Sequence, residues 1–353
     1  MVGFEGTTLN AETEDLIRNH HIGGLILFGR NYENPEQLHH LIQDLQAVAQ
    51  SSPSGLPLFI SVDQEGGKVA RLKTPFTDYP SLCCLGEAES KDLAYRFARA
   101  LARELSDVGI NMDYAPVLDV HTNPQNPIIG DRAFSTDPEW TAQLGIEFLR
   151  GFKDEGMIPV GKHFPGHGDT LLDSHLDLPY VERPAEILEA VELLPFRKTI
   201  ACGLPVIMTA HVIYTAWDSK LPATFSPKIL QNLLRKELGF EGIIISDDLE
   251  MKAVEKHYSF DAFPRMGVEA GVDVFLICHD QEKIRALHER LTREVETGAI
   301  LHARINASVD RITALKQQIK PPPVESPDPT CWQEDHRRLA EEMRSHLPVN
   351  ESS

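Results

Sequence analysis

Cysteine is scarce in this sequence, and a long apolar run is missing from it. The 353 residues include five cysteines, an odd number that does not form the paired framework of a small secreted domain. No apolar run approaches the roughly 20 residues that a membrane-spanning helix needs. The start of the chain also lacks the basic and apolar regions of a signal peptide. We therefore expect a cytoplasmic protein without a membrane span, although a start directly on a predicted strand is compatible with the removal of a preceding segment.

Basic residues are outnumbered by acidic ones. The chain has 34 lysines and arginines against 53 aspartates and glutamates, and 34 − 53 gives a formal net charge of −19. Sequence-independent binding to nucleic acid or to an anionic membrane needs a basic face, so this balance argues against both kinds of partner. The apolar fraction of 42% and the charged fraction of 25% are typical of a globular protein with a large core.

Short apolar runs alternate along the chain with longer stretches of helical periodicity. Nearly continuous apolar runs are typical of parallel strands that are covered on both faces. The predicted strands are 1–4, 24–28, 57–63, 112–120, 158–163, 205–211, 242–247 and 272–278, and helices are predicted at 35–50, 91–108, 138–155, 185–201 and 227–238. This pattern predicts an α/β fold, a (β/α)8 TIM-type barrel in a single domain at 1–319. A doubly wound sheet competes, but no G-x-G-x-x-G turn follows the first strand.

A proline-rich stretch follows the last predicted barrel helix. Residues 320–329 predict a semi-rigid linker, and a helix is predicted at 332–347. The segment 320–353 is too short for a second domain. It is interpreted as a C-terminal helical tail that either docks on the barrel or binds a partner.

Ionisable side chains end most of the predicted strands. In a barrel these ends surround one mouth, where barrel enzymes place their chemistry. A single aspartate at a strand end is commonly a helix cap, but six consecutive strands with such ends favour an active site. The residues are Asp63, Asp119, Lys162, His163, His211, Asp247, Asp248, His279 and Asp280.

The connection after the fifth predicted strand carries an unusual density of titratable groups. Residues 164–175 contain two histidines and two aspartates among two glycines and a proline. Asp173 and His175 are two positions apart, and a carboxylate there could orient the imidazole and hold its pKa near the operating pH. The alternative is a solvated polar loop.

Four segments resemble the signature of glycoside hydrolase family 3, and more narrowly its single-domain β-N-acetylhexosaminidase (NagZ-like) branch. The loop motif is KHFPGHGDT at 162–170, followed by Asp-Ser-His at 173–175. The other three segments are VDQEGGKVAR at 62–71, GDRAFS at 130–135 and ISDDLEM at 245–251. The resemblance runs from residue 2 to about residue 319 and implies the barrel fold.

The resemblance implies a retaining hydrolase that releases terminal β-linked N-acetylglucosamine through a covalent glycosyl-aspartate intermediate. Asp247 would be the nucleophile, while Asp248 would cap the next helix. His175 would be the general acid/base, with Asp173 as its partner. Five further residues would contact the sugar hydroxyls: Asp63, Arg71, Arg132, Lys162 and His163.

The same resemblance sets the expected partners. The branch is associated with muropeptide or cell-wall fragments and peptidoglycan recycling, so we expect a small carbohydrate substrate. We expect no metal and no cofactor. We also expect a monomer.

Three other functions remain open on the residues alone. A metal-dependent barrel hydrolase of the amidohydrolase type would use His163, His211 and His279 as ligands, but that family begins with an H-x-H that residues 4–6 lack. Lys162 would form a Schiff base in a second enzyme class. A non-catalytic sugar-binding barrel is the third alternative.

Overall fold

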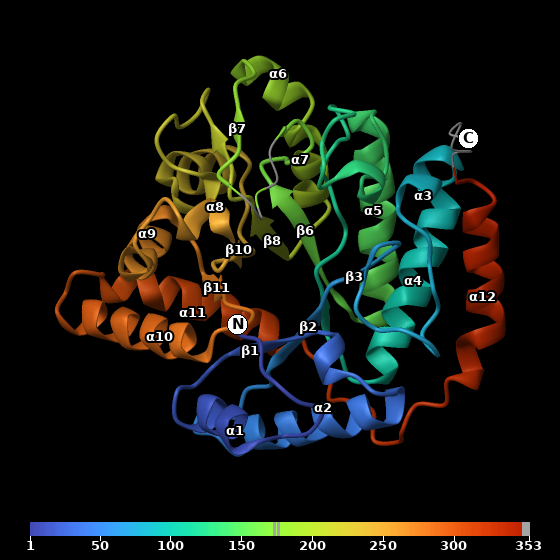
Figure 1. Ribbon diagram of the computed structural model, residues 1–353, viewed down its shortest axis with the longest axis horizontal. Coiled ribbons are helices and arrows are strands. Elements are labelled where there is room, and N and C mark those ends of the chain that lie inside the picture. The colour runs from blue at the N-terminus through green and yellow to red at the C-terminus, as the bar shows by residue number, and fades with distance from the viewer. Residues whose placement is uncertain (172–173, 175–176, 348–353) are drawn as a thin grey trace.

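A parallel sheet forms the centre of the molecule. The computed structural model describes residues 1–171, 174 and 177–347. Seven parallel strands pair in the order in which they follow one another along the chain, and the sheet curls in space (Figure 1). These strands are β1 (Gly24–Leu27), β2 (Phe59–Val62), β5 (Met112–Asp113), β6 (Ile158–Phe164), β8 (Val206–Thr209), β10 (Ile243–Asp248) and β11 (Val274–Leu276). Seven of the predicted strands are therefore confirmed in place and in direction.

The eighth predicted strand, at 1–4, is present as a bridge only. Val2 pairs in parallel with Leu25 of β1 and with Ile277, which follows β11. The Val2 N–H donates to the Gly24 carbonyl at 3.1 Å, and the Gly3 N–H donates to the Ile277 carbonyl at 2.9 Å. The observed architecture is an α/β fold around a seven-stranded curled sheet, consistent with a TIM-like domain, and the complete eight-stranded barrel stays a prediction.

The predicted strand at 112–120 is also shorter than expected. Only Met112–Asp113 is regular strand, and Val117 forms an isolated bridge with Lys162. Pro116 has no N–H to donate, so the regular strand ends before it, although its carbonyl still accepts from the Lys162 N–H at 3.2 Å. The Leu118 N–H also contacts β6, by donating to the Lys162 carbonyl at 2.7 Å.

Helices cover the sheet, and most of the predicted helices are present. Asn34 caps α2 by accepting from the Gln37 N–H at 2.9 Å. The predicted helix at 185–201 is wrong as one piece, because Pro195 cannot donate to the carbonyl of Val191 and the chain breaks into α6 and α7. The predicted helix at 227–238 is π-helical (η4). The main helices are α1 (Ala11–Arg18), α2 (Pro35–Gln50), α4 (Lys91–Asp107), α5 (Pro138–Glu155), α6 (Ala185–Ala190), α7 (Leu193–Ala201), η4 (Lys228–Glu237), α9 (Phe263–Ala270), α10 (Gln281–Glu296), α11 (His302–Lys316) and α12 (Thr330–Arg344).

Short elements decorate the connections between these strands and helices. The hairpin of β3 (Gln64–Gly66) and β4 (Val69–Ala70) follows β2 directly, and its two strands pair antiparallel. The others are α3 (Cys83–Glu87), η1 (Gly29–Asn31), η2 (Gly130–Arg132), β7 (Tyr180–Val181), β9 (Ile213–Tyr214), η3 (Ala223–Phe225), α8 (Lys252–Glu255) and η5 (Phe260–Ala262).

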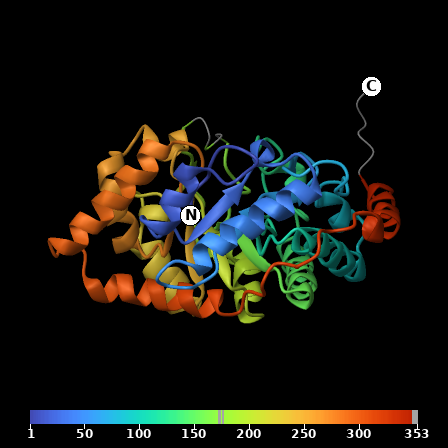
Figure 2. The ribbon, with the colours of Figure 1, turned by 90° about the horizontal axis from the view of Figure 1, so that it is seen from below.

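The proline-rich linker runs along the outside of the molecule from α11 to α12 (Figures 1 and 2). Gln43 of α2 holds it by donating from Nε2 to the Pro323 carbonyl at 3.1 Å. The tail helix begins and ends slightly before the predicted 332–347, and it packs beside α4. Its buried side chains are Trp332, Leu339, Ala340 and Met343.

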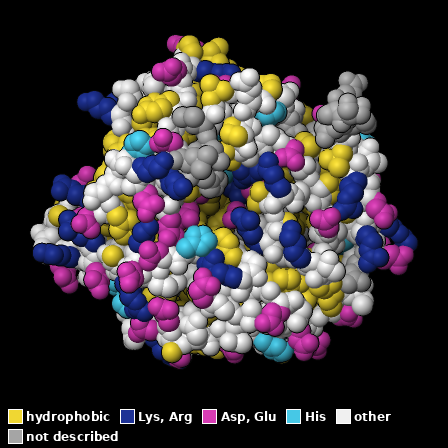
Figure 3. Space-filling view, viewed as in Figure 1, with side chains coloured by type: hydrophobic (Ala, Val, Ile, Leu, Met, Phe, Trp, Pro, Cys, Tyr) yellow, Lys and Arg dark blue, Asp and Glu magenta, His cyan; other side chains and the backbone are white. Residues whose placement is uncertain are grey.

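The surface carries both signs of charge. Figure 3 shows acidic side chains interspersed with lysine and arginine over one face. Among the helices of the described residues, none is both long and apolar enough to span a bilayer.

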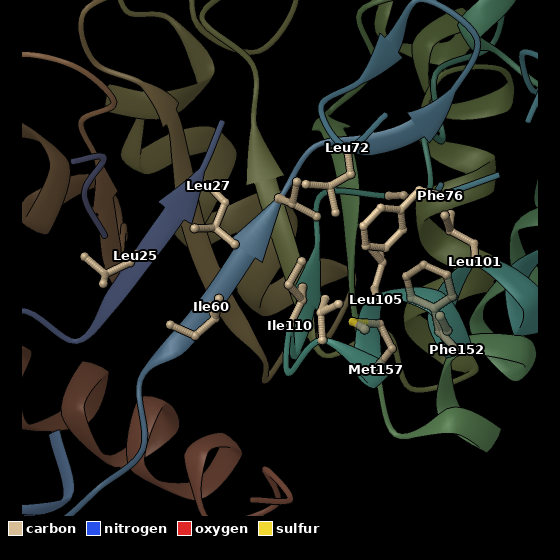
Figure 4. Close-up of a cluster of buried hydrophobic side chains, with 14 of the residues drawn as sticks. Leu25, Leu27, Ile60, Leu72, Phe76, Leu101, Leu105, Ile110, Phe152 and Met157 are labelled. Atoms are coloured by element: carbon tan, nitrogen blue, oxygen red, sulfur yellow. The ribbon is translucent and has the colours of Figure 1, made fainter. Parts of the chain in front are cut away.

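The largest buried cluster joins the first strands to the helices outside them. Figure 4 shows Leu25 and Leu27 of β1 and Ile60 of β2 in one cluster with Leu101 and Leu105 of α4. These strand positions are almost fully buried, as expected for a parallel sheet covered by helices. This packing fixes the positions of the strands relative to one another. The polar side chains at the carboxyl ends of the strands are thereby held close together.

Candidate active site

A pocket of about 250 Å³ opens at the carboxyl ends of the strands, and Figure 3 shows the surface hollowed near its centre. The structure brings together six of the eight predicted site residues in its lining: Asp63, Arg71, Arg132, Lys162, His163 and Asp247. The other two, Asp173 and His175, lie outside the described residues. Ser174, which stands between them in the sequence, is buried and lines the pocket.

A buried ion-pair network forms one wall of this pocket. Lys162 of β6 places its Nζ 2.8 Å from Asp63 Oδ1 and 2.6 Å from Glu65 Oε1. Arg132 donates to both oxygens of Glu65, from Nε at 2.8 Å and from Nη2 at 2.7 Å. Glu65 is 1% exposed, so its carboxylate depends on these two cations for its ionic partners.

The network keeps its members charged. Burial by itself raises the pKa of Glu65, but Arg132 and Lys162 outweigh burial and hold that pKa below its usual range. Burial by itself lowers the pKa of Lys162, yet Asp63 and Glu65 outweigh it and raise the pKa above its ordinary value. An ammonium group has no free electron pair, which argues against a Schiff-base role for Lys162.

Glu65 is a site residue that the sequence analysis did not select. It lies inside the 62–71 segment, beside Asp63, but it does not end a strand. Its position in the β3–β4 hairpin points it at Arg132 and Lys162, which are distant in the sequence. The sequence shows only a carboxylate followed by two glycines. That pattern is the same whether the carboxylate forms a buried ion pair or a surface ion pair.

Asp63 and Arg71 face the pocket next to this network. Asp63 Oδ2 lies 3.8 Å from Arg71 Nη2, and both side chains are partly exposed. Gln64 places Arg71 by accepting from its backbone N–H at 2.8 Å. The two residues therefore present a carboxylate and a guanidinium with unfilled hydrogen-bonding capacity toward the pocket.

A second buried carboxylate orients the histidines. Asp119 is fully buried and accepts from His163 Nδ1 at 2.7 Å, from the His163 N–H at 3.1 Å and from the His167 N–H at 2.7 Å. Burial by itself raises the pKa of Asp119, but the facing His163 outweighs it and lowers the pKa below its ordinary value. A carboxylate can only accept, so Nδ1 of His163 carries the proton. The strand-end position of Asp119 had marked it as notable, although not as a site residue.

Two adjacent aspartates at the end of β10 have different environments. Burial by itself raises the pKa of Asp247, but His163 and His211 outweigh burial and hold that pKa below its ordinary value. Burial, with the nearby carboxylates of Glu250 and Asp247, raises the pKa of Asp248 to about 7. At neutral pH the first aspartate is therefore the fully ionised member of the pair.

The expected capping role of Asp248 is wrong. Its Oδ1 accepts from the Glu250 N–H at 3.1 Å and closes the turn after β10. The following helix, α8, has Met251 at its N-cap position and no side-chain cap there. The first residue of α8 is Lys252, so the Asp248 carboxylate lies before the helix and is used in the turn.

His167 fills both of its ring nitrogens within the loop. Nδ1 lies 2.9 Å from Thr170 Oγ1 and Nε2 lies 3.1 Å from Ser174 Oγ. Burial, with the neighbouring His163, lowers the pKa of His167 to about 4, so the imidazole is neutral at pH 7. Its contacts and its pKa suit a residue that supports the loop.

Each of the three histidines of the metal alternative has hydrogen-bond partners of its own. His163 is bonded to Asp119, His211 lies 2.7 Å from Thr224 Oγ1 and 3.0 Å from the Asp248 carbonyl, and His279 lies 3.1 Å from Arg30 Nη1. Within the part of the chain that the structure describes, no three His, Cys, Asp or Glu side chains form a cluster that could hold a metal ion.

Comparison with known proteins confirms the resemblance seen in the four segments. Residues 1–315 match the family model described as "Glycosyl hydrolase family 3 N terminal domain". The β-hexosaminidase of Alkalilimnicola ehrlichii is 41% identical over 297 residues, which cover 82% of this chain and 83% of that protein.

Solved structures agree with this assignment. A glycoside hydrolase family 3 β-N-acetylglucosaminidase from a Paenibacillus species superposes with a TM-score of 0.94 at 42% identity, covering 98% of this chain. This chain spans only 66% of that enzyme. NagZ from Neisseria gonorrhoeae, solved with N-trifluoroacetyl-D-glucosamine, superposes with a TM-score of 0.79 at 31% identity, covering 99% of this chain and 97% of its own.

We predict that Glu65→Ala lowers the free energy of unfolding by about 3–5 kcal/mol, because it leaves two buried cations without their shared carboxylate. Urea denaturation followed by circular dichroism measures this change. Glu14→Ala is the control, since it removes an exposed pair with Arg18 and should have a much smaller effect. Equal losses in the two variants would contradict the proposed importance of the buried network.

Proposed function

We propose, from the premise that this chain belongs to glycosyl hydrolase family 3 and is a glycosidase of the β-N-acetylhexosaminidase kind, that it releases terminal β-linked N-acetylglucosamine with retention of configuration. The observation that carries this proposal is the position of the Asp247 carboxylate in a pocket that also holds Asp63, Arg71 and Lys162. A nucleophile and a set of charged sugar-binding groups are the parts that a retaining glycosidase requires.

Asp247 is the proposed nucleophile. It lies at the end of β10, and its Oδ1 accepts from the Asp248 N–H at 2.8 Å. That bond fixes the carboxylate and leaves its other oxygen for attack on the anomeric carbon. Because the pKa of Asp247 is lowered and that of Asp248 is raised to about 7, the charge of the pair favours Asp247 as the attacking group.

The five predicted sugar-binding residues divide into three kinds. Asp63 and Arg71 are partly exposed and are proposed to contact the sugar hydroxyls directly. Arg132 and Lys162 are almost fully buried and are already paired with Glu65. Besides contacting the sugar, they therefore hold the Glu65 carboxylate in place. His163, fixed through Nδ1 by Asp119, has Nε2 as its remaining hydrogen-bonding atom.

His175 is the proposed general acid/base, with Asp173 as its partner. Both residues lie outside the described part of the chain, so this role rests on the sequence resemblance and on their neighbour. Ser174 lines the pocket and lies within hydrogen-bond distance of His167. An imidazole suits proton transfer near neutral pH, whereas His167 itself has both nitrogens occupied.

The wider setting follows from the same premise. We propose that 1–319 is the catalytic unit, a (β/α)8 barrel closed by the bridge of Val2 to both edge strands, with 320–353 as an extension. The proposed substrate is a muropeptide or cell-wall fragment met in the cytoplasm. We propose that the protein acts as a monomer and without a metal or cofactor.

Product analysis tests the proposed function. We expect hydrolysis of p-nitrophenyl β-N-acetylglucosaminide, with the β-anomer of N-acetylglucosamine as the first product seen by NMR, because two displacements retain the configuration. An α-anomer as the first product would contradict the covalent intermediate. Activity that EDTA abolishes and zinc restores would favour the metal hydrolase instead.

We predict that Asp247→Asn lowers kcat by roughly 10³-fold or more, because the covalent route loses its nucleophile. A fluorinated glycoside that forms a slow intermediate should label the wild-type enzyme, and peptide mapping should place the label on Asp247. Asp280→Asn is the matched control, since Asp280 also follows a strand but caps α10, a role that asparagine retains. A label on Asp248 would contradict the assignment.

We predict that His175→Ala slows a natural disaccharide far more than a dinitrophenyl glycoside, because an activated phenol departs with little protonation. Assistance by a general acid is worth about 10²–10⁴-fold, which bounds the difference in kcat/KM. Asp173→Ala should give the same pattern more weakly. His167→Ala is the comparison, and it should slow both substrates alike because His167 supports the loop. An equal loss on both substrates in His175→Ala would remove the acid/base role.

A further inference from the structure

The tail helix α12 contacts a short segment of the barrel that lies far from it in the sequence. This segment, residues 76–80, connects the β3–β4 hairpin side of the site to α3. The Trp332 ring stacks on Phe76 with 5.7 Å between ring centroids. Arg344 bonds to the Asp78 carbonyl and, at 2.8 Å, to Asp78 Oδ2. Both ends of α12 therefore touch the 76–80 segment.

A buried carboxylate of α4 contacts both the tail helix and the 76–80 segment. Glu104 is 1% exposed, and its Oε1 lies 2.6 Å from His336 Nδ1 and accepts from the Tyr79 hydroxyl at 3.3 Å. Its Oε2 accepts from the Thr77 N–H at 2.9 Å. One carboxylate thus connects α4, the tail helix and the 76–80 segment, and His336 is the tail's contribution to this junction.

The 76–80 segment in turn contacts the backbone of the β3–β4 hairpin. The Gly67 N–H donates to the Tyr79 carbonyl at 2.8 Å. Gly66 has a φ of +98°, and a Cβ there would come within 2.5 Å of the Pro80 carbonyl oxygen, so the two backbones are in contact. Figure 4 shows Phe76 directed into the buried cluster next to Leu72, the residue that follows Arg71.

The hairpin supports groups that the proposed function assigns to the sugar. Glu65, in β3, orients Arg132 and Lys162. Arg71 follows β4, and its backbone N–H donates to the side chain of Gln64. A displacement of the hairpin therefore moves both the guanidinium at the pocket and the carboxylate behind it.

We propose that α12 is a positioning element for the sugar-binding hairpin, acting through Trp332, His336 and the 76–80 segment. The proposal rests on the proposed function, because it assumes that Arg71, which follows the hairpin, contacts the substrate. A variant that loses binding common to the ground state and the transition state has a higher KM with kcat unchanged, and the proposed chemical step takes place at Asp247, which lies on β10 and not on the hairpin. The tail, on this view, sets the affinity for the sugar.

The test compares His336→Ala with Glu342→Ala. Glu342 also docks α12 on α4, through Arg96 at 2.9 and 2.6 Å, but among the described residues no hydrogen bond or ion pair joins its side chain to the 76–80 segment. We expect His336→Ala to raise KM for the p-nitrophenyl glycoside about 3–10-fold with kcat within about twofold, the signature of lost uniform binding. Glu342→Ala should leave both parameters unchanged, even where it lowers the melting temperature as much. His336→Asn places an amide nitrogen near Nδ1 and should restore KM.

Hydrogen exchange gives a readout that does not need turnover. The backbone amides of 64–72 should exchange faster in His336→Ala than in the wild type, and at the wild-type rate in Glu342→Ala. If His336→Ala does not fold, Trp332→Leu, which removes the stacking on Phe76, takes its place with the same expectations. Equal KM and equal exchange in the His336 and Glu342 variants would overturn the proposal. A wild-type protein that does not cleave the glycoside would instead contradict the proposed function, while the exchange rates still decide the positioning role.

Discussion

The shared carboxylate of Glu65 is the interaction on which the rest of the site depends. It places Arg132 and Lys162 within hydrogen-bond distance of one buried anion, and Lys162 in turn reaches Asp63 at the pocket surface. Three segments far apart in the sequence are thereby held in one geometry. Without this carboxylate Arg132 would lose its buried ion-pair partner and Lys162 would keep Asp63 alone, which makes the burial of the two cations costly. The sugar-binding wall is therefore built around a residue that is itself hidden from the sugar.

Electrostatics also separates groups that are chemically identical. Asp247 and Asp248 are adjacent, yet the first faces His163 and His211 while the second faces Glu250. Their pKa values move in opposite directions, and only Asp247 combines a lowered pKa with a position that suits a nucleophile. Similarly, Asp119 fixes the proton of His163, whereas His167 is neutral and occupied. One fold thus produces different roles from repeated residue types through the neighbours it supplies.

Much of the fold could be predicted from local patterns, because parallel strands that are buried on both faces need continuous apolar runs and leave their polar ends at one edge. The departures have local physical causes. Pro195 breaks the helix predicted at 185–201, Pro116 interrupts the strand predicted at 112–120, and the residues at 1–4 contribute a bridge through Val2 instead of a regular strand. The sequence did not identify Glu65 as a site residue, because the burial of a carboxylate depends on partners elsewhere in the chain.

The amino-acid sequence by itself determined the order and direction of the strands, the family resemblance and the placement of Asp63, Lys162, His163 and Asp247 near one pocket. These follow from periodicity, strand ends and short motifs, which are local properties. Only the tertiary structure decided which aspartate stays ionised, which cations Glu65 joins and that the tail helix reaches the 76–80 segment through His336 and Trp332. Desolvation and Coulomb interactions act between groups that are close in space, and the distances that govern them exist only after the chain has folded.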